Sequence, residues 1–368
     1  MDRRRFMRTG ALGGVAAAGL AAPALAQTAP RIRWRCASAF PPVFDALHGG
    51  ALDLARFLRE ATDGAFEIEI VPPGGLGPVS GLADAAIGGA VEMTHTASHY
   101  YIDKDPAYAL GAALPFAMNA RALEAWLLAG GGIDLLNGFF EGQGLRYLPG
   151  GNTGAQMGGW FRREINAVQD LKGLKIRAVG LAGEVMKRLG AVPQPLPVEA
   201  IAPALERGEL DAAEWVGPYD DEKAGFAKLA PFYYYPGWWE GSLSLSFLVN
   251  KDAHDRLPPT YRSLLAMAAR AVTIEMQGKY DFRNPAALAR LVAGGAQLRP
   301  FPQDMLNAAF DAANKLYGEI AGRNPAFKTI HDSMMAFRAE TYRYQQVPEY
   351  TFDTFMMIKQ REGALGGA

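Results

Sequence analysis

Two glutamates that stand beside tryptophans are the residues of this sequence best placed to do chemistry. Glu214 comes directly before Trp215 in the stretch AAEWVGPYDD, and Glu240 follows Trp238 and Trp239 in the stretch PGWWEG. Carboxylates in apolar surroundings must be paired, protonated or bound to a cation, because an isolated buried charge is costly. These acid–tryptophan pairs therefore indicate a catalytic pair, a sugar-binding platform, a metal site or ordinary packing.

The alternatives give the two acids different roles. In a glycoside hydrolase, Glu214 and Glu240 would act as the general acid and the nucleophile, with the tryptophans stacking on the sugar. In a metal site, both would be oxygen ligands of a hard cation, completed by oxygens such as that of Gln156 or by backbone carbonyls. In ordinary packing, both would be surface acids beside core tryptophans. The residue types alone leave these alternatives open.

Arg177 is a third polar residue in apolar surroundings. It lies in the stretch LKIRAVG, which is typical of a short strand. An arginine at the end of an α/β strand lies where such folds bind ligands, and its planar guanidinium can hold a carboxylate through two parallel hydrogen bonds. A surface salt bridge is the alternative for this residue.

Familiar catalytic and nucleotide-binding motifs are absent from the sequence. Neither a G-x-x-x-x-G-K-[ST] loop nor a G-x-S-x-G elbow occurs, and the stretch GGLGPVSG lacks the spacing and context of a dinucleotide site. His95 and His99 are four residues apart, but no glutamate lies between them and their segment begins like a strand. We expect no zinc site there.

The first 26 residues predict an export signal. Residues 1–26 have a basic start, a run of small apolar residues from Gly10 to Ala22, and an A-x-A site at 24–26. Such a segment is removed on export, and it is too short to anchor the chain in a membrane. The stretch RRRFMR resembles a twin-arginine signal, with an ordinary Sec signal as the alternative. We expect cleavage before Gln27 and a periplasmic protein.

The composition excludes several classes of protein. The 368 residues carry a net charge of −1 and the signal segment carries +3, so the remaining 342 residues carry −4. This weak acidity argues against a nucleic-acid partner. No later segment has the ~20 apolar residues of a membrane-spanning helix. Cys36 is the only cysteine, so the chain has no internal disulfide, and its place in an alternating strand predicts a core residue and not a nucleophile.

The pattern along the chain predicts the elements that position these residues. Residues 31–40 and 66–71 alternate like strands, and between them apolar residues recur with helical spacing from Leu47 to Leu58. This strand–helix–strand order favours a mainly parallel α/β sheet. A second α/β unit begins near residues 148–154.

The later segments complete the second unit. Residues 171–180 predict a short strand with Arg177, 181–190 a helix, and 198–215 a helix followed by a strand that carries Glu214. From Gln303 onward the pattern is helical until Pro348, after which the stretch EYTFDTFMMIKQRE predicts a last amphipathic helix. Two units of similar size favour a two-lobed protein with its ligand between the lobes.

Longer motifs resemble one family. The stretches LKGLKIR and ALERGELDAAE resemble the signature of the solute-binding proteins of tripartite ATP-independent periplasmic (TRAP) transporters. The stretches GGNTGAQMGGWFRREI, EWVGPYDDEKAGF, APFYYYPGWWEG and NPAFKTIHDS resemble, more narrowly, the branch that binds α-keto acids such as pyruvate, and lactate. The resemblance covers essentially the whole mature chain. It implies a receptor and not an enzyme, which captures a small 2-oxo or 2-hydroxy monocarboxylate and delivers it to the TRAP membrane permease.

The resemblance also implies roles for the ligand-binding residues. Arg177 matches the arginine that pairs with the ligand carboxylate, and Gln156 matches a polar group that contacts both ligand and metal. Trp215 matches the residue that lends its backbone carbonyl to the site. Asn152 and Tyr100 lie in segments that match the wall of the ligand cleft.

By the same resemblance, Glu214 and Glu240 match carboxylates that bind a cation against the ligand, with Gln156 and the Trp215 carbonyl as further ligands. The two acids and a ligand carboxylate sum to −3, and Arg177 brings the sum to −2. A sodium ion would leave −1 and a calcium ion would leave zero, so the cost of burying residual charge favours calcium. The resemblance favours sodium, and the choice stays open. The acid also stays open, because pyruvate, lactate and 2-oxobutyrate differ by groups worth about 1–3 kcal/mol in a pocket.

The implied fold is the two-lobed α/β fold of periplasmic binding proteins, in its TRAP type, with crossing hinge strands and a long helix that spans both lobes. We expect residues 27–152 and about 243–285 in the first lobe, and residues 153–242 and about 286–345 in the second. Residues 346–368 would form a C-terminal helix, which in the keto-acid branch is associated with packing on the partner in a homodimer. Closure on the ligand would be a hinge motion.

Overall fold

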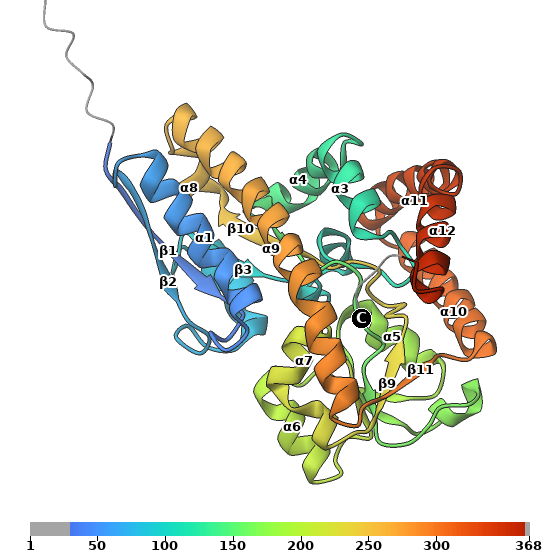
Figure 1. The fold of residues 1–368 in the computed structure, drawn as a ribbon. Helices are drawn as coiled ribbons and strands as arrows, with labels where there is room; N and C mark the ends of the chain where they lie inside the picture. The colour runs from blue at the N-terminus through green and yellow to red at the C-terminus, as the bar shows by residue number, and fades with distance from the viewer. Residues whose placement is uncertain (1–29, 365–368) are drawn as a thin grey trace, which may run out of the picture.

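The computed structural model describes residues 30–364 as two lobes, each built around one β-sheet (Figure 1). The predicted export signal, residues 1–26, and the cleavage site before Gln27 lie outside the described residues. None of the helices in the described part is long and apolar enough to cross a membrane.

The first lobe has a five-stranded sheet in the order β2-β1-β3-β10-β4. β1 pairs in parallel with β2 and β3, whereas β10 runs antiparallel to β3 and β4. The strands are β1 Ile32–Ser38, β2 Phe66–Val71, β3 Met93–Thr96, β4 Leu145–Asn152 and β10 Ser244–Asn250. The helices are α1 Asp45–Ala61, α2 Leu82–Ile87, α3 Ala120–Leu128, α4 Gly132–Gly142 and α8 Lys251–Asp255, with 3-10 turns η1 Val79–Gly81, η2 Ser98–Tyr101 and η3 Pro106–Gly111.

The strand–helix–strand order predicted for the start of the chain is confirmed by β1, α1 and β2. In β1, Trp34 and Cys36 are buried while Arg33 and Arg35 are exposed, so the alternation of residue types follows the two faces of the sheet. Cys36 is a core residue, as predicted, and burial raises the pKa of its thiol.

The second lobe has a six-stranded sheet in the order β11-β9-β5-β8-β6-β7. β6 runs parallel to β7 and β8, while β5 runs antiparallel to β8 and β9, so the mainly parallel character predicted for the sheets is interrupted by one reversed strand in each. The strands are β5 Trp160–Phe161, β6 Lys175–Arg177, β7 Val192–Gln194, β8 Ala212–Ala213, β9 Phe232–Tyr235 and β11 Gln297–Pro300. The helices are α5 Gly180–Arg188, α6 Val198–Glu206, α7 Pro218–Ala224 and α10 Gln303–Ala321, with 3-10 turns η4 Val168–Leu171 and η5 Phe226–Lys228.

A helix of 35 residues, α9 Pro259–Ala293, connects the lobes. It packs on α1 and β4 of the first lobe and on α7 of the second, and Figure 1 shows it running diagonally past both. Only the resemblance implied this helix. The exposed apolar side chains Met267, Ile274 and Phe282 blur its amphipathic pattern, which is why its periodicity is weak in the sequence.

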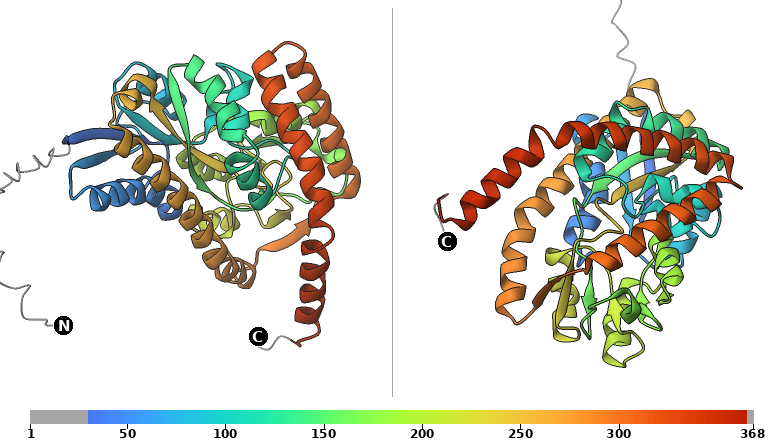
Figure 2. Two further views of the ribbon diagram at one scale, coloured as in Figure 1. Left: turned by 90° about the horizontal axis from the view of Figure 1, so that it is seen from above. Right: turned by 90° about the vertical axis from the view of Figure 1, so that its right-hand side faces the viewer.

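The C-terminal part consists of two helices, α11 Pro325–Gln345 and α12 Glu349–Arg361. The break predicted at Pro348 is confirmed, since this residue lies between them. α11 packs on α3, α4 and α10, whereas α12 buries none of its residues. Figure 2 shows α12 extending away from the body of the molecule.

Candidate functional site between the two lobes

A buried pocket lies where the two lobes meet, and it contains most of the polar residues singled out in the sequence. The first lobe contributes η2 and the start of α1, the second contributes the ends of β6 and β8, and the segment between β9 and β10 closes one side. The lining residues are Phe40, Leu47, His99, Tyr100, Arg177, Val179, Glu214, Trp215, Val216, Glu240 and Leu243.

The centre of the site is an ion pair between Arg177 and Glu214. β6 and β8 are parallel neighbours in which Arg177 lies opposite Ala213, so Glu214 follows directly after the end of β8. Arg177 Nη1 donates to both carboxylate oxygens of Glu214, at 2.8 and 2.9 Å, and its Nε donates to the carbonyl of Leu196 at 3.2 Å. Because Arg177 is only 2% exposed, the surface salt bridge considered for it is excluded.

Glu240 is the second buried acid of the pocket. It is 5% exposed, and its carboxylate lies 3.5 Å from His99 Nδ1. Burial, followed by the negative charge of Glu214, raises the pKa of Glu240 well above its ordinary value. Burial also raises the pKa of Glu214, although Arg177 opposes this. The protein alone therefore favours one ionised acid, held by Arg177, and one neutral acid.

Two oxygens near these acids have no protein partner. Gln156 donates through Nε2 to Thr153 Oγ1 at 3.2 Å, but its buried Oε1 accepts no hydrogen bond. Among the hydrogen bonds within residues 30–364, none goes to the carbonyl oxygen of Trp215 either. The backbone amide of Gln156 donates to the Glu240 carbonyl at 3.1 Å, and the next amide, that of Met157, donates to Val216 at 3.2 Å. Gln156 is thus held between the two segments that carry the acids.

This set of donors suits a hard cation. Two carboxylates, an amide oxygen and a backbone carbonyl are oxygen ligands of the type that sodium and calcium take. Burial, and after it the charge of Glu214, keeps Glu240 protonated, and the positive charge of a cation there would oppose both effects. Within residues 30–364 no group of three or more histidines, cysteines and acids is arranged to hold a metal, so the candidate site depends on its neutral oxygens.

His99 lines the pocket, although the sequence analysis considered it only for a zinc site and expected none there. It lies in η2, just beyond the end of β3, and burial together with Arg177 lowers its pKa to about 3, so the imidazole is neutral. Its neighbour Tyr100 also lines the pocket, and burial raises its pKa to about 12. The position after the carboxyl end of a sheet strand is the signal that would have identified His99.

Asn152 does not line this pocket. Its amide nitrogen donates to Glu124 Oε1 at 3.1 Å, and its Oδ1 accepts from the amide of Gly154 at 2.8 Å. Asn152 has no exposed surface. These contacts hold the turn that follows β4. A place for Asn152 elsewhere in the cleft wall stays a prediction.

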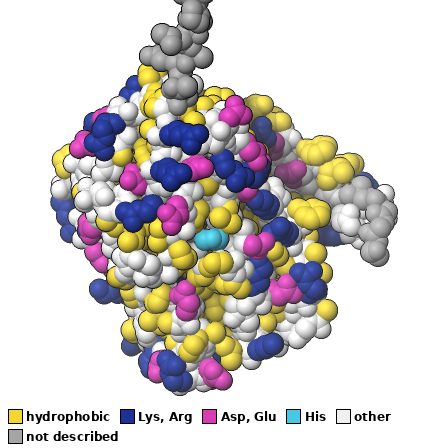
Figure 3. Space-filling model, turned by 90° about the vertical axis from the view of Figure 1, so that its left-hand side faces the viewer, with side chains coloured by type: hydrophobic (Ala, Val, Ile, Leu, Met, Phe, Trp, Pro, Cys, Tyr) yellow, Lys and Arg dark blue, Asp and Glu magenta, His cyan; other side chains and the backbone are white. Residues whose placement is uncertain are grey.

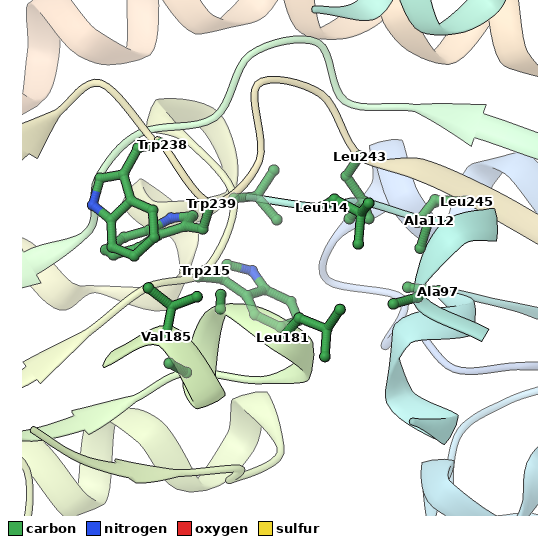
Figure 4. Close-up of a cluster of buried hydrophobic side chains, with 14 of the residues drawn as sticks. Ala97, Ala112, Leu114, Leu181, Val185, Trp215, Trp238, Trp239, Leu243 and Leu245 are labelled. Carbon is green, nitrogen blue, oxygen red and sulfur yellow. The ribbon is translucent and has the colours of Figure 1, made fainter. Parts of the chain in front are cut away.

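The tryptophans are packed and do not form a sugar platform. Trp215, Trp238 and Trp239 are each at most 7% exposed, and they lie together with aliphatic side chains from both lobes (Figure 4). The Trp238 ring stacks on Phe116 with centroids 5.2 Å apart. The Trp215 ring lies 5.1 Å from the Arg177 guanidinium carbon and so supports the charged group from one side.

The sequence matches one known protein family. Residues 38–324 match the family described as bacterial extracellular solute-binding protein, family 7, or DctP. Among curated proteins, the chain is 41% identical to the monocarboxylate 2-oxoacid-binding periplasmic protein of Nostoc sp. strain PCC 7120, over 98% of this chain and 100% of that protein.

Solved structures of similar proteins contain ligands. A TRAP transporter solute-binding protein from Bordetella bronchiseptica RB50 has a TM-score of 0.89 and 40% identity, covering 91% of this chain and 99% of that one, and it is a mixed-occupancy dimer with calcium and picolinate in one active site. One from Pseudoalteromonas atlantica T6c, with sodium and pyruvate bound, has a TM-score of 0.83 and 36% identity, covering 88% of this chain and 98% of that one.

Proposed function

Because this chain belongs to family 7 of the bacterial extracellular solute-binding proteins, we propose that it is the TRAP receptor for a small 2-oxo or 2-hydroxy monocarboxylate. Proteins of this family are periplasmic receptors that hand their ligands to a membrane permease, and they are not enzymes. Neither the family nor the relatives support the glycoside hydrolase that Glu214 and Glu240 had suggested. The observation that carries the proposal is the buried pairing of Arg177 with Glu214, beside Glu240 and the unpartnered oxygen of Gln156.

We assign the ligand carboxylate to Arg177. Nη1 and Nε are already occupied by Glu214 and Leu196, whereas Nη2 makes none of the hydrogen bonds found within residues 30–364. A carboxylate that reaches Nη2 would gain a charge-assisted hydrogen bond in a site from which water is largely excluded. Tyr100 lies on the same pocket wall and can donate its hydroxyl to the ligand.

We assign the cation to Glu214, Glu240, the Gln156 side-chain oxygen and the Trp215 carbonyl. When bound, a sodium or calcium ion would supply the positive charge that the 2-oxygen and carboxylate of the ligand require. The relatives bind calcium in one case and sodium in another, which supports a site that accepts either ion. Charge balance favours calcium, because that ion leaves the buried site neutral.

Apart from His99, the rest of the pocket is apolar and restricts the ligand to a short chain. Its apolar walls are Phe40, Leu47, Val179, Val216 and Leu243. These side chains offer no partner for a sugar hydroxyl, and an unpaired hydroxyl buried among them would be costly. A methyl or ethyl group on the 2-carbon of the acid fits this environment better than a polyol.

Calorimetric titration of the mature chain tests the proposal. In buffer with Na⁺ and Ca²⁺, we expect saturable heat with pyruvate, lactate or 2-oxobutyrate, and recovery of the ligand unchanged. Propionate is a matched control, because it has the carboxylate but no 2-oxygen for the cation, and it should bind at least tenfold more weakly. Absence of heat with all three acids, or turnover of a sugar, would contradict the proposal.

We further propose that α12 makes a homodimer contact. The segment from the end of α11 through α12 exposes a set of large apolar side chains, and Figure 3 shows such side chains gathered beside the C-terminal end of the described chain. These residues are Tyr344, Val347, Tyr350, Phe352, Phe355, Met357 and Ile358. A contiguous exposed apolar patch marks an interaction site, and the Bordetella relative is a dimer.

Changing Phe352 and Phe355 to serine together should convert a dimer into a monomer. The change removes two aromatic side chains that are 62% and 54% exposed, so the fold of the monomer should be unaffected. Light scattering coupled to size-exclusion chromatography measures the mass. The control is Leu52→Ser on α1, which is 50% exposed and should leave the mass unchanged. A monomeric wild-type protein would contradict the proposal.

We also propose that the chain is exported and cleaved before Gln27, as the sequence pattern predicts. The periplasmic relatives support the export, and the residues around the cleavage site lie outside the described part.

A further inference from the structure

One carboxylate at the start of α1 joins three elements of the fold. Asp45 is the first residue of α1 in the first lobe. It accepts hydrogen bonds from the Tyr219 hydroxyl, at 2.9 and 3.1 Å, and from Lys223, both of which belong to α7 in the second lobe. It also accepts from Arg283 Nη1 of α9 at 2.8 Å. Figure 1 shows α1 and α7 on the same side of α9.

The partners of Asp45 are held in place without it. The Tyr219 amide donates to Asn284 Oδ1 at 3.0 Å, and Arg283 Nη1 donates to the Tyr219 hydroxyl at 2.9 Å. Lys223 Nζ lies 3.8 Å from the centre of the Tyr219 ring, and Arg283 Cζ lies 4.9 Å from it. α7 and α9 thus form a preorganised binding site for Asp45 that carries two positive charges. When the lobes close, Asp45 is the group that the other lobe adds to this site. Its partners are already held in place, so forming the contact costs little conformational entropy.

The charges favour the approach of Asp45 to α7 and α9. Lys223 and Arg283 both lie against the ring of Tyr219, and within the cluster Asp45 supplies the negative charge that pairs with them. Partial burial acts to raise the pKa of Asp45, but hydrogen bonds from Lys223 and Tyr219 outweigh it and lower the pKa to about 2. The Asp45 side chain is 48% exposed, so solvent and salt weaken the attraction. Such an interaction can bias a closure without making it irreversible.

Asp45 is coupled to the pocket through its neighbours on α1. Phe44 comes directly before it and packs against Trp215 with ring centroids 5.3 Å apart. Phe40 and Leu47, on either side in the sequence, line the pocket itself. When the start of α1 moves away from α7, Phe44 must separate from Trp215, and Phe40 and Leu47 must move away from the second-lobe wall of the pocket. Opening of this contact therefore opens the path to the ligand.

We propose that Asp45, with Tyr219, Lys223 and Arg283, forms a latch that holds the two lobes closed and sets the rate of ligand release. This proposal rests on the proposed receptor function, because a receptor must close on its ligand and open again at the permease. The latch lies outside the ligand site, so it acts on the open–closed equilibrium and not on ligand contacts.

Ligand kinetics give the first test. Asp45→Asn and Tyr219→Phe should each speed pyruvate dissociation about fivefold to tenfold in stopped-flow measurements, with association nearly unchanged. Tyr219→Phe removes one hydroxyl and leaves α1 untouched, so it separates the latch from the stability of that helix. The control is Glu319→Gln, which breaks an exposed pair with Arg188 inside the second lobe and should leave dissociation unchanged. Dissociation at the wild-type rate in both latch variants would overturn the proposal.

A second test measures closure directly and can be read even in the absence of ligand. Dyes at Arg33→Cys and Arg207→Cys report the distance between the lobes, and Cys36 is fully buried and so escapes labelling. Single-molecule energy transfer should show a smaller closed fraction in Asp45→Asn than in the wild type, both with and without saturating pyruvate. Equal closed fractions would overturn the latch. If the wild type binds no 2-oxo acid but the fractions differ, the proposed ligand is wrong and the latch stands.

Discussion

Replacing Arg177 with lysine is expected to weaken pyruvate binding at least tenfold. The guanidinium holds Glu214 through Nη1 and the Leu196 carbonyl through Nε, and its Nη2 makes none of the hydrogen bonds found within residues 30–364. An ammonium group cannot reproduce this fork, so either the ligand or Glu214 loses its partner. Each charge-assisted hydrogen bond is worth about 1.5–3 kcal/mol, and about 1.4 kcal/mol corresponds to a factor of ten in affinity.

Calorimetry under saturating cation measures this effect on the dissociation constant. The matched control is Arg188→Lys, which changes an arginine of the same lobe whose side chain is 30% exposed and pairs with Glu319 on the surface. That variant should bind pyruvate like the wild type. Unchanged affinity in Arg177→Lys would show that the buried arginine stabilises Glu214 only and does not contact the ligand.

Replacing Glu240 with glutamine should abolish the dependence of pyruvate binding on the cation and lower affinity about a hundredfold. Without Glu240 the cation loses one of two charged ligands, and the ligand carboxylate then faces Glu214 with less compensation. Folding should be nearly unaffected, because burial holds the pKa of Glu240 well above its ordinary value and an amide resembles the neutral acid.

The measurement is titration of protein freed of sodium and divalent ions, followed by addition of sodium or calcium. In the wild type, each ion should tighten pyruvate binding, and by linkage pyruvate should tighten the binding of that ion by the same factor. The control is Glu222→Gln, which breaks the pair with Arg290 on the surface. Tight binding of pyruvate by metal-free wild type would refute the cation site.

Local patterns predicted the parts of the fold that depend on near neighbours. β1 alternates because one face of its sheet is buried, and α12 begins after Pro348 because proline interrupts a helix. Local patterns did not predict α9, because its buried face changes partner along its length, from α1 to α7, while Met267, Ile274 and Phe282 stay exposed. Only a resemblance over the whole chain implied a helix there.

In the site, the sequence predicted which residues matter but not which of them pair with one another. The sequence identified Arg177, Glu214 and Glu240 from their apolar surroundings, and all three lie in one pocket. It did not predict that Arg177 pairs with Glu214, because they are 37 positions apart and meet only through the pairing of β6 with β8. Asn152 matched a family segment, yet its amide donates to Glu124. Long-range pairing of this kind leaves no local pattern.

The buried thiol of Cys36 bears on where the protein can mature. Because the sequence has one cysteine and that cysteine is enclosed in the first lobe, the fold contains no covalent cross-link that an oxidising compartment would have to install. The chain can therefore reach its final packing while still in the reducing cytoplasm, where nothing needs to be oxidised or reshuffled. A secretion route that carries folded proteins across the inner membrane is therefore compatible with this chain. Glutathione and thioredoxin have no disulfide to reduce in it, so they leave its stability unchanged.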